Sequence, residues 1–163
     1  MYFDGTGDWL VAASRAPLSL AGNFTIEMWV YRAVSGNNYF FGLGDSSTST
    51  GIEGYLGSTG TALNVFSNNA VRITSSTVPA ITTWAHFAVV RSGSTVTMYL
   101  NGVSLGTWTS SATFSGAFYV GAEFYTGSVT GSMNGYIDDL RLTNGYARYT
   151  ANFTPPTSAL QDQ

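Results

Sequence analysis

The stretch from Trp84 to Trp108, WAHFAVVRSGSTVTMYLNGVSLGTW, constrains the fold more than any other part of the chain. It predicts three consecutive antiparallel strands, because Ser92-Gly93-Ser94 interrupts the first pair and Asn101-Gly102 the second. Asn-Gly between two alternating apolar runs is a strong hairpin signal, since both turn residues must adopt positive φ. One face of the middle strand is expected to carry three apolar residues, namely Val96, Met98 and Leu100.

The first of these strands is apolar on both faces, with Phe87 and Val89 on one side and Ala88 and Val90 on the other. Such a strand is typical of the middle of a sheet that is covered above and below. Further strands are expected in turn. The segment from Phe24 to Tyr31 is the clearest, with Phe24, Ile26, Met28 and Val30 on one face. No helical period appears and turn signals recur about every 8–12 residues, which predicts an all-β, two-sheet antiparallel β-sandwich. We assign three further large aromatic residues to packing: Trp29, Trp84 and Tyr99.

The composition narrows the class of protein. The 163 residues predict one domain over 1–163, with a C-terminal tail from about 155 where Pro155-Pro156 leads the chain out of the fold. Only 9% of residues are charged, all six basic residues are arginines and the net charge is −3, which argues against a nucleic-acid partner. The absence of cysteine excludes disulfides and zinc–thiolate sites.

Two regions suggest local features. The polar run from Asp45 to Gly51 predicts a mobile loop, and residues Ala147 to Asn152 could hold a short helical turn. No basic and apolar leader follows Met1, so we expect no signal peptide. The longest strictly apolar run, Trp9 to Ala13, is too short to insert across a membrane.

Four motifs in order along the chain carry a family resemblance: YFDGTGDWL, FTIEMWV, WAHFAVVRSGSTVTMYLNGVSLG and GYIDDLRLTNGYARYTANFTPP. Together they resemble the laminin G-like jelly rolls of the concanavalin A-like lectin/glucanase superfamily, over residues 2 to about 156. The closing motif is most similar to versions found in bacteriophage tail and other virion proteins. The resemblance implies a jelly roll of two sheets, one of them curved, that binds glycan or protein at its loop rims or concave face, in some members with calcium.

Catalysis is not expected. Glucanases of this fold need closely spaced carboxylates on one strand, and Glu27, Glu53 and Glu123 stand far apart in sequence. His86 is the only histidine, and in an apolar strand a lone histidine is usually a packed residue with one satisfied nitrogen. We therefore predict a protein that is not an enzyme.

Two interpretations of the aspartates stay open. The resemblance makes the first and last strands neighbours, which would bring Asp4 and Asp138 together as ligands of a calcium ion. Alternatively, Asp4 caps its own Asp-Gly turn and Asp138 pairs with an arginine such as Arg141 or Arg148.

A sugar site would need exposed aromatic rings beside amide or carboxylate groups. The candidate ligand-binding residues near predicted loops are Tyr39, Asp45, Tyr55, Asn68, Asn69, Trp108, Glu123 and Tyr125. The opposing interpretation is that most aromatic residues of a sandwich belong to its core. At the end of the chain, we expect Tyr149 and Phe153 to pack the terminal segment onto the sheet, with Arg148 bonded to Asp139 or to a carbonyl.

Three functional hypotheses follow. The first is a lectin-like module at a virion surface or outside the cell that binds cell-surface glycan through loops. The second is a structural virion protein, a capsid decoration or tail component, that binds neighbouring protein subunits. The third is an accessory module of a larger glycan-degrading enzyme. The sequence leaves the sugar, the host and any homo-oligomer open.

Overall fold

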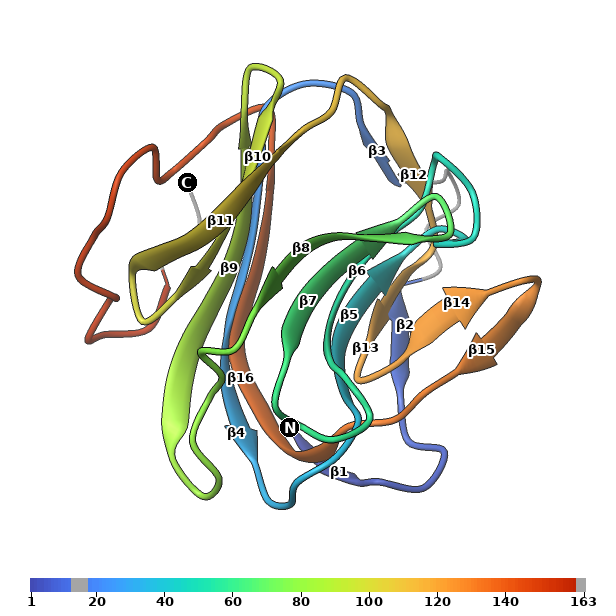
Figure 1. Cartoon of the computed structure of the whole chain (residues 1–163), viewed down its shortest axis with the longest axis vertical. Coiled ribbons are helices and arrows are strands. Elements are labelled where there is room, and N and C mark those ends of the chain that lie inside the picture. The colour runs from blue at the N-terminus through green and yellow to red at the C-terminus, as the bar shows by residue number, and fades with distance from the viewer. Residues whose placement is uncertain (13–17, 161–163) are drawn as a thin grey trace.

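The computed structural model describes residues 1–12 and 18–160, and within them the regular structure is entirely β (Figure 1). Two six-stranded antiparallel sheets face each other as a sandwich. In spatial order, sheet A consists of β1 (Tyr2–Asp4), β16 (Asn134–Asn144), β4 (Phe24–Arg32), β9 (Trp84–Ser92), β10 (Thr95–Leu100) and β11 (Val103–Thr109). Sheet B consists of β2 (Leu10–Ala12), β13 (Phe118–Val120), β5 (Asn38–Leu43), β6 (Ile52–Leu56), β7 (Leu63–Ser67) and β8 (Ala70–Ser75). Two small ribbons complete the fold: β3 (Leu18–Leu20) with β12 (Phe114–Gly116), and β14 (Glu123–Tyr125) with β15 (Ser128–Thr130).

The core lies between the inner faces of the two sheets. The predicted face of β4, with Phe24, Ile26, Met28 and Val30, is completely buried and packs against apolar side chains of sheet B. Each such side chain contributes roughly 1.5–3 kcal/mol through removal of its surface from water. The predicted two-sheet sandwich is therefore confirmed, and it follows from the period-2 alternation of these strands.

The central meander forms as predicted. Asn101 and Gly102 have φ values of 50° and 77°, as a two-residue turn between β10 and β11 requires. The Asn101 side chain also fixes this turn to β9, since its Oδ1 accepts the backbone N–H of His86 at 2.9 Å. The meander thus places β9 in the middle of sheet A, between β4 and β10.

The segment of residues 146–160, here called the terminal segment, runs along the outer side of sheet A (Figure 1). Tyr149 and Phe153 pack this segment onto the sheet as predicted, where they cover Ala88, Val90 and Tyr99. Their rings also stack on each other with centroids 3.5 Å apart. The backbone N–H of Phe153 donates to the carbonyl oxygen of Gly102 at 2.9 Å. This cover explains why β9 is apolar on both faces: one side meets sheet B and the other meets the terminal segment.

Three expectations for the end of the chain are wrong. Residues 147–152 form bends and no helical turn. The chain does not leave the fold at Pro155-Pro156 but turns back, so that the N–H of Leu160 donates to the carboxylate of Asp139 at 3.1 Å and 3.2 Å. Within the described residues, Arg148 bonds neither Asp139 nor a carbonyl, and its Nε donates instead to Thr143 Oγ1 at 2.9 Å.

A buried arginine fastens the β3–β12 ribbon to the sandwich. Arg91 is 1% exposed and donates from Nε to the carbonyl oxygen of Gly22 at 2.6 Å and from NH2 to that of Leu20 at 2.7 Å. Its third contact is with the carbonyl oxygen of Ala112. This ribbon was not predicted, because its strands are only three residues long, too short for alternation to be distinguished from chance.

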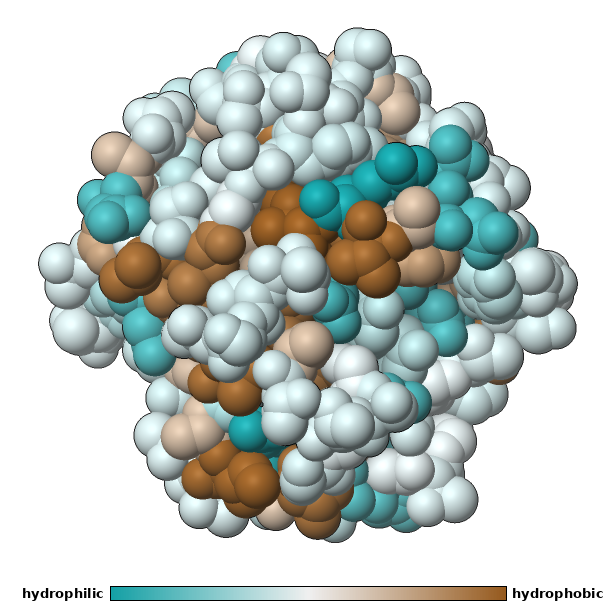
Figure 2. All heavy atoms as spheres, viewed as in Figure 1, coloured by the Kyte–Doolittle hydropathy of each residue, from teal (hydrophilic) through white to brown (hydrophobic). Residues whose placement is uncertain are grey.

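The surface is polar but weakly charged. Figure 2 shows one face covered mostly by side chains of near-neutral hydropathy, with apolar atoms in several separate patches. This matches the low share of charged residues. Within residues 1–12 and 18–160, the chain contains no helix of the length and apolar character needed to cross a membrane.

Candidate functional site

Aromatic side chains gather on the outer face of sheet B. Tyr39 on β5 and Tyr55 on β6 are partners in the strand register, and their rings stack with centroids 5.1 Å apart at an interplanar angle of 10°. Phe66 on β7 follows, with its ring 6.4 Å from that of Tyr55 in an edge-to-face arrangement. All three side chains are half-buried. Strand alternation explains Tyr55 and Phe66, because their neighbours Leu56 and Val65 point into the core. In β5 a register shift between Tyr39 and Phe41 places Phe41 in the core instead.

The β14–β15 hairpin lies over this face, beside β5. Its tip is held by one carboxylate: Asp45 accepts the N–H of Thr126 at 3.1 Å and that of Gly127 at 3.0 Å. The same carboxylate accepts the N–H and the hydroxyl of Ser47 at 2.9 Å and 2.6 Å. Burial opposes ionisation of Asp45, but these hydrogen bonds outweigh it and hold its pKa below the ordinary value. The Asp45 loop, predicted to be mobile, is thus a bonded turn that anchors the hairpin.

The turn between β7 and β8 closes the same rim. Asn68 and Asn69 both have positive φ, and their N–H groups donate to the carbonyl oxygens of Thr48 and Ser46 at 3.0 Å and 3.2 Å. The hydroxyl of Tyr125 on the hairpin donates to Oδ1 of Asn69 at 2.7 Å. Three segments distant in sequence therefore meet at one rim of sheet B.

Two buried carboxyl groups lie where the hairpin meets the sheet. Glu53 on β6 is 2% exposed and Glu123 on β14 is 8% exposed. Glu123 also accepts the hydroxyl of Thr130 at 2.9 Å. The close approach depends on Gly42, because a Cβ at that position would lie 3.0 Å from the Cα of Glu123. Glu53 and Glu123 are therefore far apart in the sequence but close together in the fold.

Burial, followed by the hydrogen bond and the charge of Glu123, raises the pKa of Glu53 to about 9. Glu53 is therefore protonated at neutral pH, and its buried Oε2 makes no hydrogen bond of good geometry within the described part of the chain. Burial and the two nearby carboxyl groups also raise the pKa of Tyr39, so its hydroxyl keeps its proton. The two carboxyl groups thus lie together where the hairpin meets the sheet.

The structure brings together most of the predicted ligand-binding residues. Tyr39, Asp45, Tyr55, Asn69, Glu123 and Tyr125 lie on this outer face or at its rim, and Asn68 lies in the adjoining turn. We call this set, with Phe66 and Glu53, the Tyr39 face. Sequence reasoning missed Phe66 and Glu53, although Glu53 shares the alternation face of Tyr55.

Trp108 lies elsewhere. It is on β11 at the edge of sheet A, packs against the core beside Phe114 and has the Arg72 guanidinium 5.4 Å from its ring centroid. Trp108 was a candidate because it was predicted to lie near a loop. It lies instead on the inward face of a strand, apart from the other candidates.

The two aspartates expected to share a calcium ion do not meet. Asp4 is the register partner of Asn134, and its Oδ1 accepts the N–H of Thr6 at 2.7 Å, which caps its own turn. Asp138 is four residues further along β16, roughly 13 Å away at the rise of a strand, and its Oδ1 accepts the N–H of Asp139. Among the described residues no group of three or more acidic, histidine or cysteine side chains is arranged to hold a metal ion. Calcium stays a prediction to which this geometry adds no support.

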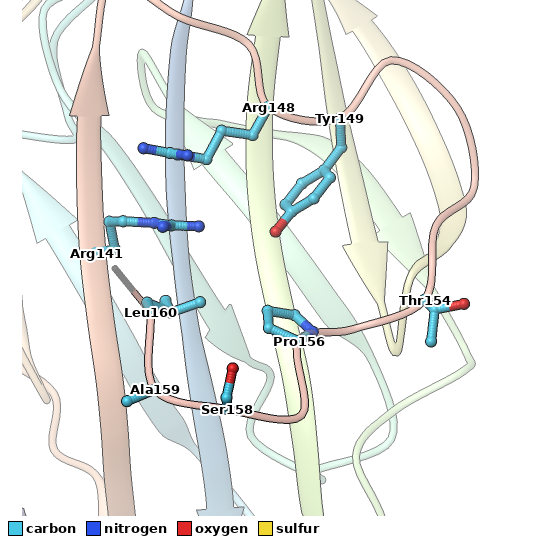
Figure 3. Close-up of a pocket in the computed structure, with 8 residues that line it drawn as sticks. All are labelled: Arg141, Arg148, Tyr149, Thr154, Pro156, Ser158, Ala159 and Leu160. Atoms are coloured by element: carbon cyan, nitrogen blue, oxygen red, sulfur yellow. The ribbon is translucent and has the colours of Figure 1, made fainter. Parts of the chain in front are cut away.

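Apart from the Tyr39 face, a hollow lies between sheet A and the terminal segment. It has a volume of about 340 Å³, and Figure 3 shows Arg141 extending from β16 while Arg148 and Tyr149 extend from the terminal segment. Both arginines approach Glu27, a fully buried residue of β4: Arg141 NH2 lies 2.7 Å and Arg148 Nε 3.8 Å from its Oε1. The Glu27 carboxylate thus balances one of the two positive charges that line this hollow.

Glu27 is the centre of a structural cluster. Its carboxylate accepts Arg141 Nε at 2.8 Å and the hydroxyl of Tyr149 at 2.7 Å. Burial opposes ionisation, but the close approach of His86, the hydrogen bonds from Tyr149 and Arg141 and the charge of Arg141 outweigh it, so the pKa of Glu27 is lowered. His86 is buried as predicted, with Nε2 3.3 Å from Glu27, but neither ring nitrogen makes a hydrogen bond of good geometry. We interpret this cluster as the attachment of the terminal segment.

The fold defines a lectin-like β-sandwich with a rim built from loops. Residues 4–148 match the model of the Laminin_G_3 family, described as the concanavalin A-like lectin/glucanases superfamily, and the chain belongs to this family. No curated protein sequence matches the chain.

Solved structures share the fold at low sequence identity. Domains LG4-5 of the mouse laminin α1 chain superpose with a TM-score of 0.67 at 19% identity, over 87% of this chain and 40% of that chain. The native heptameric SAP-like pentraxin of Limulus polyphemus gives 0.65 at 21% identity, over 86% of this chain and 73% of that chain. Domain 4 of AbnA, a GH43 extracellular arabinanase of Geobacillus stearothermophilus solved in complex with arabinotriose, gives 0.58 at 16% identity, over 90% and 82%.

Proposed function

We propose that this protein is a non-catalytic, lectin-like module that binds glycan at the Tyr39 face. One observation carries the proposal: partly buried aromatic rings on three adjacent strands lie beside an amide-bearing rim built from the Asp45 loop, the Asn68-Asn69 turn and the β14–β15 hairpin. The glycan-bound domain of AbnA has the same fold, which supports the proposal.

The chemistry of the face suits a sugar. Aromatic rings pack against the apolar C–H face of a pyranose, while amide and hydroxyl groups hold its hydroxyls. Asn69 supplies an exposed amide, and Tyr125 is fixed beside it by their 2.7 Å hydrogen bond. Little of this arrangement has to be ordered upon binding, which reduces the entropic cost.

The acidic pair does not indicate hydrolysis. A glycosidase needs two carboxyl groups that flank the substrate from an open cleft. Glu53 and Glu123 are instead 2% and 8% exposed, beneath a hairpin that they help to hold. We therefore propose binding without catalysis, with the pair in a structural role.

The setting that we propose is the surface of a virion or of a cell. It rests on the resemblance of the closing stretch GYIDDLRLTNGYARYTANFTPP to virion proteins. Calcium binding remains a prediction, and glycan binding in the presence of the chelator EGTA tests it.

A glycan array probed with and without EGTA tests the proposal. We expect binding to a restricted set of glycans, weakened roughly tenfold by Tyr55→Ala and by Asn69→Ala. Tyr146→Ala is the matched control, since Tyr146 is 62% exposed and lies on the terminal segment, away from sheet B. Loss of binding in EGTA would support calcium. Binding to no glycan, with tight binding to purified capsid or tail protein, would overturn the proposal in favour of a structural virion component.

A further inference from the structure

Four aromatic residues form a continuous row across the outer face of sheet A. Tyr2, Tyr136, Tyr31 and Trp84 are successive register partners on β1, β16, β4 and β9. Their ring centroids are separated by 5.1 Å, 5.6 Å and 5.5 Å. We call this row the aromatic ladder.

The ladder is open to solvent. Tyr2 is 62% exposed, Trp84 42% and Tyr136 41%, while Tyr31 is half-buried between its neighbours. The assignment of Trp84 to packing is therefore wrong: the terminal segment covers the middle of sheet A but not this end of it. Within residues 1–12 and 18–160, no hydrogen bond occupies the three tyrosine hydroxyls or the indole N–H. These polar groups are available to a ligand.

The ladder ends at a pocket. Tyr2, its last member, also lines a pocket of about 350 Å³ together with Met1, Phe3, Asp8, Trp9 and Leu10. Trp9 is 43% exposed, so its indole offers a further apolar surface. The Asp8 carboxylate is fixed there, because Oδ2 accepts the N–H of Asp4 at 3.1 Å. The row of rings thus leads to a polar acceptor beside an aromatic wall.

We propose that the aromatic ladder and this pocket bind an uncharged glycan chain, at a site separate from the Tyr39 face on the other sheet. Exposed rings with unoccupied hydroxyls match a chain that presents both C–H faces and hydroxyl groups. Asp138, an exposed residue in the adjoining row, and Asp8 are acceptors for sugar hydroxyls and repel acidic polysaccharides.

None of the five described arginines faces the ladder. Two are buried, one covers Trp108 and two approach Glu27: Arg32, Arg91, Arg72, Arg141 and Arg148. The described cation nearest the rings is the N-terminal ammonium group of Met1 at the pocket, and it donates to the carbonyl oxygen of Ile137 at 2.7 Å. An acidic polysaccharide would therefore find no guanidinium counter-charge along the rings.

The size of the ladder favours a glycan over a protein partner. At these exposures the three open rings offer roughly 300 Å², taking the usual area of aromatic side chains. A stable protein interface needs about 800 Å² on each side. An extended oligosaccharide requires much less.

Affinity electrophoresis in native gels containing hydroxyethyl cellulose, galactomannan or dextran tests this inference, with alginate as the acidic comparison. We expect at least one neutral polymer to retard the protein, and Trp84→Ala or Tyr136→Ala to weaken its binding roughly fivefold to tenfold. Tyr31→Phe, which keeps the ring, tests the hydroxyl separately and should cost less than either. Tyr146→Ala is the matched control, because Tyr146 and Tyr2 have the same exposed fraction of 62%. Thermal midpoints confirm that each variant folds.

The variants distinguish the proposal for the ladder from the proposal for the Tyr39 face. Loss of retardation in the ladder variants but not in Tyr55→Ala supports the ladder. Retardation that only Tyr55→Ala abolishes overturns the ladder and leaves the Tyr39 face in place. Preference for alginate, absence of retardation by every neutral polymer, or self-association that Trp84→Ala abolishes would each overturn the inference.

Discussion

Replacing Glu53 with glutamine is expected to stabilise the protein, increasingly so as the pH rises. The Glu53 carboxyl group has an ordinary pKa of 4.5 and a pKa of about 9 in the fold. Between these values the folded chain holds a proton that the unfolded chain has released. The free energy of unfolding therefore falls by up to about 1.4 kcal/mol per pH unit over that range.

At pH 7 this amounts to about 3 kcal/mol, a large part of the stability of an ordinary domain. Glutamine supplies a neutral donor toward Glu123 at every pH, so Glu53→Gln removes the cost. The gain should approach about 3 kcal/mol at pH 7 and vanish near pH 4.5.

Urea unfolding at pH 5, 6, 7 and 8, followed by tryptophan fluorescence, measures the effect. The difference between Glu53→Gln and wild type should widen at each step. If the difference stays constant with pH, Glu53 does not hold a proton in the fold and the account of the acidic pair is wrong.

Glu27→Gln is the matched control with the opposite sign. The lowered pKa of Glu27 means that its carboxylate stabilises the fold above the unfolded pKa and loses this contribution as the pH falls through the folded value. Glu27→Gln should therefore destabilise by about 3 kcal/mol at pH 7, since Arg141 loses its buried partner. The cost should shrink in acid.

Two further substitutions test the attachments of the fold. Gly102→Ala places a Cβ against the carbonyl oxygen of Phe153 and should cost about 3 kcal/mol and expose the terminal segment to limited proteolysis. Gly93→Ala, also at positive φ but in open space, should cost only about 1 kcal/mol, and equal costs would contradict the contact. The lysine in Arg91→Lys cannot donate to three carbonyl oxygens in this geometry, so the substitution should lower the free energy of unfolding by about 3 kcal/mol. An unchanged thermal midpoint would show that the β3–β12 ribbon does not depend on these hydrogen bonds.

Residue alternation predicted the core well. It grouped the side chains of β4, β9 and β10 by face correctly, because successive residues of a strand point to opposite sides of the sheet. The Asn101-Gly102 turn was equally clear, since few residues adopt positive φ at low cost. These features are local and depend on few neighbours.

What alternation could not predict is which groups meet across the fold. Asp45 binds residues 81 and 82 positions away, and Glu53 meets Glu123 although nothing in their local sequence links them. Alternation also assigns a face without saying what covers it. Trp84 and Ala88 share the outer side of β9, yet only Ala88 lies beneath the terminal segment.

The terminal segment has a consequence for synthesis. On the ribosome, all strands of both sheets precede Tyr149 and Phe153 in the chain. Until these two residues emerge, Ala88, Val90 and Tyr99 face water on an otherwise finished sheet. Nascent chains stalled in this interval would present an adhesive apolar surface, so recruitment of chaperones should peak there and end once the last rings are in place.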